Sequence, residues 1–192
     1  MAESVVSGPL RVQTKETDGG LFVPAKLGSF YTGTWTDTRI AAGDYVMRKT
    51  ALAQAGQAVF HVGSYLLHKV GADPMSGGLT HDIRGIELSS IDLIYGIGTA
   101  ALVTHTYDIL QTTYANNVAN AVVATVGGTL SGALATATQA NPYVTRITLG
   151  TLYVLGANTA LRNVTLEISW DAAATSVLDY YGCYLNFNYN LL

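Results

Sequence analysis

The sequence predicts an all-β protein: an antiparallel β-sandwich or jelly-roll-like domain with an extended N-terminal arm. Several segments alternate nonpolar and polar residues with period two, which is the spacing of a half-buried strand. Gly, Asn and Pro turn signals separate these segments, and no rhythm of strands alternating with helices is visible. The chain has 192 residues, 49% of them hydrophobic, which is enough to bury one substantial core.

The N-terminal region shows no sustained period. Residues 1–30 contain Pro9, Pro24 and the pair Gly19-Gly20 among scattered charges. They are expected to form an extended arm that drapes over a neighbouring molecule, with terminal disorder as the alternative. The run DPMSGG over residues 73–78 is the clearest break that follows.

These signals predict three parts: the arm over residues 1–30, a β-rich segment with a short helix over residues 31–78, and a sandwich over residues 79–192. Within the second part, alternating threonines over residues 32–38 predict a strand, and a second strand is expected over residues 45–48. The short helix is expected over residues 50–58, before a strand over residues 59–68.

The middle of the chain carries a strong strand signal in RGIELSSIDLIYGI, residues 84–97. Its nonpolar positions change phase at Ser89-Ser90, which predicts a β-bulge there. A second strand is expected over residues 99–113. Val103, His105, Tyr107 and Ile109 are expected to share one of its faces.

The C-terminal third alternates most clearly, over residues 144–149, 163–170 and 181–191. The inward positions are expected to be Ile147, Leu149, Val164, Leu166, Ile168, Trp170, Tyr181, Cys183, Leu185 and Phe187. Arg146 and Thr148 are expected to face outward. In the last strand the other face carries Tyr184 with Asn186 and Asn188, and Tyr184 could meet a neighbouring subunit or a host glycan, although ordinary cross-strand packing is an equal alternative.

Charged residues are scarce, at 12% against about 25% in a typical soluble domain. A surface so poor in ions is expected to be hidden against other subunits, because interface centres are depleted in charge. The alternative is a monomer with a neutral Thr- and Asn-rich surface. Residues 115–140 carry no charge and are the first candidate for a subunit contact, through Val126, Leu130 and Leu134.

Signals for catalysis are weak. The four histidines lack zinc-site spacing, the single Cys183 can form no intrachain disulfide, and no dinucleotide, phosphate-loop or G-x-S-x-G motif is present. A distant pair of carboxylates remains open. The expectation is a protein that is not an enzyme and has no cofactor and no metal. A net charge of −3 disfavours nucleic acid as a partner, and no apolar run suggests a membrane span.

Two segments carry a resemblance. RGIELSSIDLIY, residues 84–95, and AAATSVLDYYG, residues 172–182, are similar to segments of small structural proteins of tailed bacteriophages. The resemblance covers roughly residues 80–192. It implies a head decoration (cement) or minor capsid protein, a homo-oligomer with a trimer favoured, and the major capsid protein as partner. It also implies a place on the head surface of the virion after assembly in the host cytoplasm.

The basic residues are unevenly placed, since eight of the ten Lys and Arg lie at or before Arg84. Within the resemblance, this asymmetry assigns the capsid contacts to the arm and the residues that follow it. The expected contacts are Arg11, Lys15, Lys26, Arg39, Arg48 and Lys49. Two other functions remain open: a tail or fibre subunit, and a carbohydrate-binding module with exposed aromatic rings.

Overall fold

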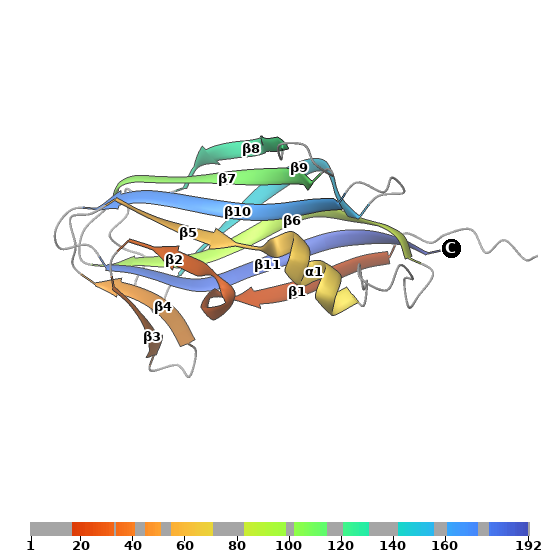
Figure 1. Ribbon diagram of the computed structural model, residues 1–192. Helices are drawn as coiled ribbons and strands as arrows, with labels where there is room; N and C mark the ends of the chain where they lie inside the picture. The colour runs from red at the N-terminus through yellow and green to blue at the C-terminus, as the bar shows by residue number, and fades with distance from the viewer. Residues whose placement is uncertain are drawn as a thin grey trace, which may run out of the picture.

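The chain forms two antiparallel β-sheets that lie face to face, as a computed structural model shows (Figure 1). The structure describes residues 17–32, 34–40, 45–50, 55–70, 83–98, 102–114, 121–130, 142–155, 161–172 and 177–191. The prediction of an all-β sandwich is confirmed.

The first sheet, called here the β11 sheet, has the strand order β3-β4-β11-β6-β9, and β1 also pairs with β11. Its strands are β1 (Thr17–Pro24), β3 (Trp35–Arg39), β4 (Tyr45–Thr50), β6 (Ile83–Gly98), β9 (Tyr143–Leu155) and β11 (Val177–Leu191). The second, the β10 sheet, has the order β2-β5-β10-β7-β8. Its strands are β2 (Ser29–Tyr31), β5 (Gly56–Phe60), β7 (Leu102–Tyr114), β8 (Ala121–Thr129) and β10 (Leu161–Ala172).

The pairing of the last eight strands is nested. β7 pairs with β8, β6 with β9, β5 with β10 and β4 with β11, as if one long hairpin had been rolled up. The rolling places β4-β11-β6-β9 in one sheet and β5-β10-β7-β8 in the other. This eight-stranded, two-sheet arrangement is a jelly roll.

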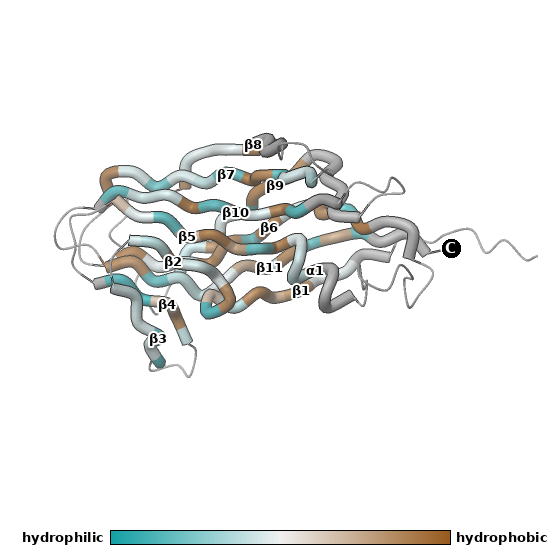
Figure 2. Tube along the Cα trace, viewed as in Figure 1, coloured by the Kyte–Doolittle hydropathy of each residue, from teal (hydrophilic) through white to brown (hydrophobic). Residues whose placement is uncertain are grey.

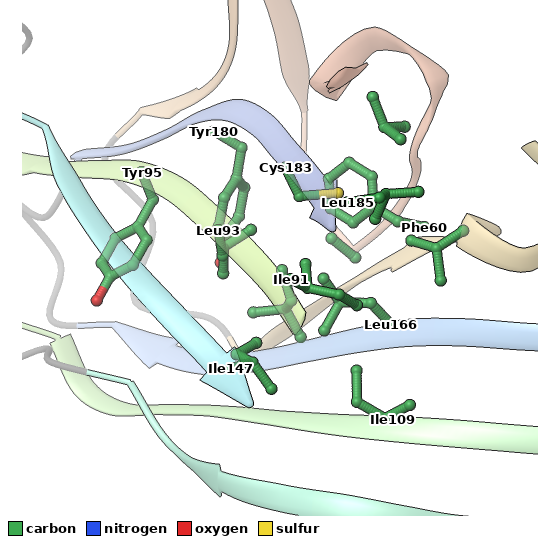
Figure 3. Packing of buried hydrophobic residues seen from close by; sticks show 14 of the residues in the cluster. Phe60, Ile91, Leu93, Tyr95, Ile109, Ile147, Leu166, Tyr180, Cys183 and Leu185 are labelled. Atoms are coloured by element: carbon green, nitrogen blue, oxygen red, sulfur yellow. The ribbon is translucent and has the colours of Figure 1, made fainter. Parts of the chain in front are cut away.

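The core lies between the two sheets. Hydrophilic and hydrophobic positions alternate along the strands (Figure 2), and the hydrophobic ones meet in the interior (Figure 3). Leu93 and Leu185 from one sheet and Leu166 and Ile109 from the other are fully buried there. The inward positions predicted for residues 144–149 and 163–170 are confirmed.

The bulge predicted at Ser89-Ser90 is confirmed. Ser90 pairs with Asn186 and Leu88 with Phe187, so Ser89 is the extra residue in β6. Its hydroxyl donates to the carbonyl of Asn186 at 2.9 Å, which ties the bulge to β11. The nonpolar residues on both sides of the bulge therefore face the same core, as the phase change in the sequence indicated.

The extended arm expected over residues 1–30 is corrected from Thr17 onward. β1 pairs with β11 over its whole length, a 3-10 turn follows at Ala25–Leu27 (η1), and β2 pairs with β5. Residues 1–16 lie outside the described residues. The arm region lacked a visible period because its outward positions include Phe22 and its central positions are the glycines Gly19 and Gly20.

The expected helix and strand of residues 50–68 are also corrected. Residues 56–60 form β5, and helix α1 (Val62–Val70) occupies most of the expected strand. Val62 and Leu66 are four residues apart, so a helix buries both on one side, where they join the core beside β10. No helix in the described part of the chain is long and apolar enough to cross a membrane.

The described strands do not divide at residue 78. β4 and β11 pair in one sheet, and β5 and β10 pair in the other, so segments from both sides of the expected boundary share each sheet. The described residues from β1 to β11 form a single sandwich.

Candidate functional site

The basic residues expected to contact a capsid have different environments. Lys26 and Arg39 are exposed, and Lys26 donates a hydrogen bond to Asp37 at 2.6 Å. Arg48 and Lys49 are used inside the chain, as described next. Arg11 and Lys15 lie outside the described residues.

Arg48 is committed to an internal ion pair. It donates through Nε and Nη2 to the two carboxylate oxygens of Asp179, each at 2.7 Å. The pair joins β4 to β11 and is largely buried. The hydrogen bonds that Arg48 donates to Asp179 raise the pKa of the guanidinium above its usual value. Arg48 is therefore poorly placed to bind another molecule.

Lys49 is buried as well. Its ammonium donates to the backbone carbonyl of Thr32 at 3.3 Å and lies 5.2 Å from the centre of the Trp170 ring. Burial lowers the pKa of Lys49 below its usual value of 10.5. Thr32 has a φ of 65°, which is unusual for a residue with a side chain, and the hydrogen bond from Lys49 supports this turn. Lys49 thus makes its contacts inside the fold and is poorly placed to bind another molecule.

The nonpolar residues expected to form a subunit contact largely face the chain's own core. Leu130 is buried in that core, and Val126 packs against it. β8, which contains Val126, pairs with β7 at the edge of the β10 sheet. Leu134 lies outside the described residues. A segment of small uncharged residues can thus complete a core as readily as it can cover an interface.

Tyr184 lies on the outer face of the β11 sheet, as predicted, in a row that crosses four strands. Phe22 on β1 is the register partner of Tyr184 on β11, which pairs with Asp92 on β6, which pairs with Arg146 on β9. In the next row, Ile94 on β6 pairs with Val144 on β9. We call the side chains of Phe22, Ile94, Val144, Arg146 and Tyr184 the outer patch.

The outer patch combines exposed hydrophobic groups with an ion pair. Phe22 is 42% exposed, Tyr184 40% and Val144 64%. Register partners on neighbouring strands have Cβ atoms about 5 Å apart, so the Phe22 and Tyr184 side chains start from adjacent positions on the β1–β11 pair. Aromatic residues and arginine are enriched in the centres of protein interfaces, whereas lysine is depleted.

The ion pair is held in a polar network. Arg146 donates to both oxygens of Asp92, at 2.7 and 2.8 Å, and the amide of Asn186 donates to the same carboxylate at 3.1 Å. These bonds, above all those from Arg146, hold the pKa of Asp92 below its usual value of 3.8. The guanidinium itself remains mostly exposed and keeps donors for another molecule.

The two aromatic rings of the outer patch pack over glycines on the neighbouring strand. The Tyr184 ring covers Gly20 on the neighbouring strand, where an added Cβ would lie 2.6 Å from the ring atom Cε1. The Phe22 ring covers Gly182 in the same way, with an added Cβ 3.0 Å from its Cζ. The rings therefore lie diagonally across the β1–β11 pair and close over backbone that has no side chain of its own.

A small second cluster adjoins the outer patch. Ile40, Val46 and Tyr181 are buried together on this side of the sheet, and Ile94 packs against them. Tyr181 was expected to face the core, and this is wrong. The register of β11 shifts between Tyr180 and Gly182, so Tyr180 takes the inward position and Tyr181 the outward one.

Chemically, the outer face can bind a surface of mixed polarity. In the described part of the chain, no group of three or more His, Cys, Asp or Glu residues could hold a metal ion. The outward alternation of residues 144–149 predicted the exposure of Arg146, but Phe22 and Asp92 were missed. Phe22 stands between Gly20 and Pro24, where the sequence shows no alternation. Its outward position follows only from the pairing of β1 with β11.

No known protein family matches the chain, and no curated protein matches it. Among solved structures, a chain described as part of an empty head of turnip yellow mosaic virus is similar at a TM-score of 0.37 and 12% identity. The likeness covers 100% of this chain and 88% of that one. A TM-score this low carries no argument about fold or function.

Proposed function

We propose that this chain is a non-enzymatic structural subunit of a virus particle, which assembles with copies of itself through the outer patch. One observation carries the proposal. Phe22, Tyr184 and Val144 expose hydrophobic surface on the same outer face of the β11 sheet, with strand β6 between Tyr184 and Val144, in a chain that has only 12% charged residues. Covering such a surface with a second subunit removes apolar area from water, at about 25 cal/mol per Å².

The polar part of the outer patch suits an interface with a copy of the chain. Arg146 and Asp92 neutralise each other, so two copies can approach without net repulsion. Arg146 keeps exposed donors that can reach a carbonyl or hydroxyl of the neighbour. The partner is therefore a surface of similar, mixed character, as expected of an oligomer formed from one chain.

The place in a virus particle rests on two further arguments. Residues 84–95 and 172–182 resemble segments of structural proteins of tailed bacteriophages. The jelly roll also occurs in viral capsid domains, although it occurs in lectins too and does not fix a function by itself. Within this proposal the finer role is head decoration or a minor capsid protein, as a trimer on the lattice of the major capsid protein.

A decoration protein would act by mass action, because a ligand that binds only the assembled shell stabilises that shell. Many weak contacts per particle would add up through multivalency. The exposed Arg39 remains available for such contacts, whereas Arg48 and Lys49 stay inside the subunit.

Electron microscopy of particles from cells that express the gene tests the proposal. Antibody raised against the purified chain is expected to label particle heads, with density on the shell lattice. Label on rings, tubes or fibres would assign the chain to the tail instead. Particles that carry no label at all would contradict a virion role.

A further inference from the structure

A cleft of about 380 Å³ opens beside β11, at the point where β1 and β4 share its edge. β1 follows β11 as far as the pair Pro24 and Gly182, and β4 takes over at the pair Met47 and Tyr180. Tyr181 lies between these two pairs on β11. The cleft occupies this gap, with Pro24 on one side and Met47 on the other.

The lining of the cleft combines an aromatic ring with a close ion pair. Tyr45 lines it and is 61% exposed. Lys26 Nζ lies 2.6 Å from Asp37 Oδ2, and both residues line the same cleft. A flat exposed ring next to strong hydrogen-bonding groups, in walls that are otherwise apolar, is the usual make-up of a small-ligand site.

We propose that this cleft binds one neutral pyranose ring of a carbohydrate. The aromatic face of Tyr45 packs against the C–H face of the sugar, as tyrosine presents both an apolar face and a polar tip. Asp37 and Lys26 hydrogen-bond to neighbouring hydroxyl groups. The volume lies near the lower end of the range for ligand pockets, about 300–1,000 Å³, which suits a single ring.

The ion pair between Lys26 and Asp37 favours a neutral ligand over a charged one. A carboxylate has about four acceptor sites and an ammonium three donors, so the single contact between Asp37 and Lys26 leaves capacity on both. An anionic or cationic ligand would have to displace a partner that is already 2.6 Å away. A neutral polyol can use the remaining sites without breaking the pair, since each hydroxyl both donates and accepts.

The protonation state of the pair suits this role. The hydrogen bond to Asp37 raises the pKa of Lys26 above 10.5, so the ammonium stays charged at neutral pH. Hydrogen bonds to charged groups are stronger than those between neutral groups. The site shares no residue with the outer patch, so a subunit held in an assembly through that patch could still carry it.

Saturation-transfer NMR on the purified full chain tests the site. The probes are millimolar methyl α-D-glucopyranoside, methyl α-D-galactopyranoside and methyl α-D-mannopyranoside. We expect transfer to at least one of them, and a loss of affinity of about tenfold or more in Tyr45→Ala and in Asp37→Asn. Tyr31→Ala is the matched control, because Tyr31 is 51% exposed and does not line the cleft.

Three results would overturn the proposal. The first is no transfer to any of the three glycosides. The second is binding that Tyr45→Ala leaves unchanged, or that Tyr31→Ala weakens equally, because stacking on any exposed tyrosine would then explain the signal. The third is competition by millimolar acetate or guanidinium, which would identify a site for an ion rather than a neutral sugar. Tyr45 is exposed, so its replacement is not expected to unfold the chain.

Discussion

Arg48 and Asp179 face each other across the β4–β11 pair, and the guanidinium donates to both carboxylate oxygens at 2.7 Å. The pair anchors the β3–β4 hairpin, which projects from one end of the sandwich (Figure 1). A residue that the sequence placed among surface contacts thus fastens the edge of the fold.

Asp179→Ala is expected to lower the free energy of unfolding by about 3 kcal/mol, because it leaves the largely buried Arg48 charge without its partner. Urea denaturation measures the shift in midpoint. Asp37→Ala is the control, since it removes an ion pair whose lysine is exposed and is expected to cost much less. Equal losses in the two variants would refute a special role for the buried pair.

Gly182→Ala is expected to destabilise the chain by about 2 kcal/mol or more. Gly182 has a φ of +139°, and an added Cβ would collide with the backbone carbonyl of Val23. Gly98→Ala is the matched control on β6, because a Cβ there meets only Val177 at an ordinary 3.6 Å. That variant is expected to be neutral or slightly more stable. The midpoints of thermal unfolding of both variants measure the effect. A Gly182→Ala variant as stable as the wild type would contradict the backbone conformation and close packing at Gly182.

The alternation of nonpolar and polar residues predicted those strands that bury one face in the core and expose the other. β10 and the outward Arg146 followed directly from alternation, and so did the bulge at Ser89. Helix α1 did not, because VFHVGSYLLH fits a strand and a helix almost equally and only the packing of Val62 and Leu66 beside β10 selects the helix.

The candidate site was only partly readable from the sequence. Tyr184 was found, but its neighbours Phe22 and Asp92 come from strands 70 residues or more apart in the chain, which no local pattern joins. Tyr181 was misassigned, since the register shift beside Gly182 depends on how β1 and β4 share the edge of β11. Long-range pairing, rather than local preference, sets these positions.

Lys49 is expected to make stability rise with pH. Its pKa is lowered in the folded chain, so the unfolded chain binds more protons between that lowered value and about 10.5. The folded state therefore gains relative stability as pH increases through this window. Lys49→Met has no such group, so its stability minus that of the wild type is expected to fall as pH rises. Urea titrations of both proteins from neutral pH upward measure the difference, and a constant difference would contradict a lowered pKa.

Cys183 is expected to be unreactive while the chain is folded. Burial raises the pKa of its thiol to about 12, and the side chain lies in the core (Figure 3). Only the thiolate reacts quickly with a disulfide reagent. At neutral pH the reagent should label Cys183 only after urea unfolds the chain. Rapid labelling without denaturant would show that the β11 region opens readily.

Assembly through the outer patch is tested most directly by sedimentation of the purified chain over a range of concentrations, with substitutions at Val144. Val144→Asp places a charge in the outer patch, and Val103→Asp places one on an equally exposed valine of the β10 sheet, at 67% against 64% exposed. The wild type and Val103→Asp are expected to sediment as oligomers, and Val144→Asp as a 20.3 kDa monomer. A wild type that remains a monomer at every concentration, or a Val144→Asp variant that assembles as the wild type does, would contradict the account.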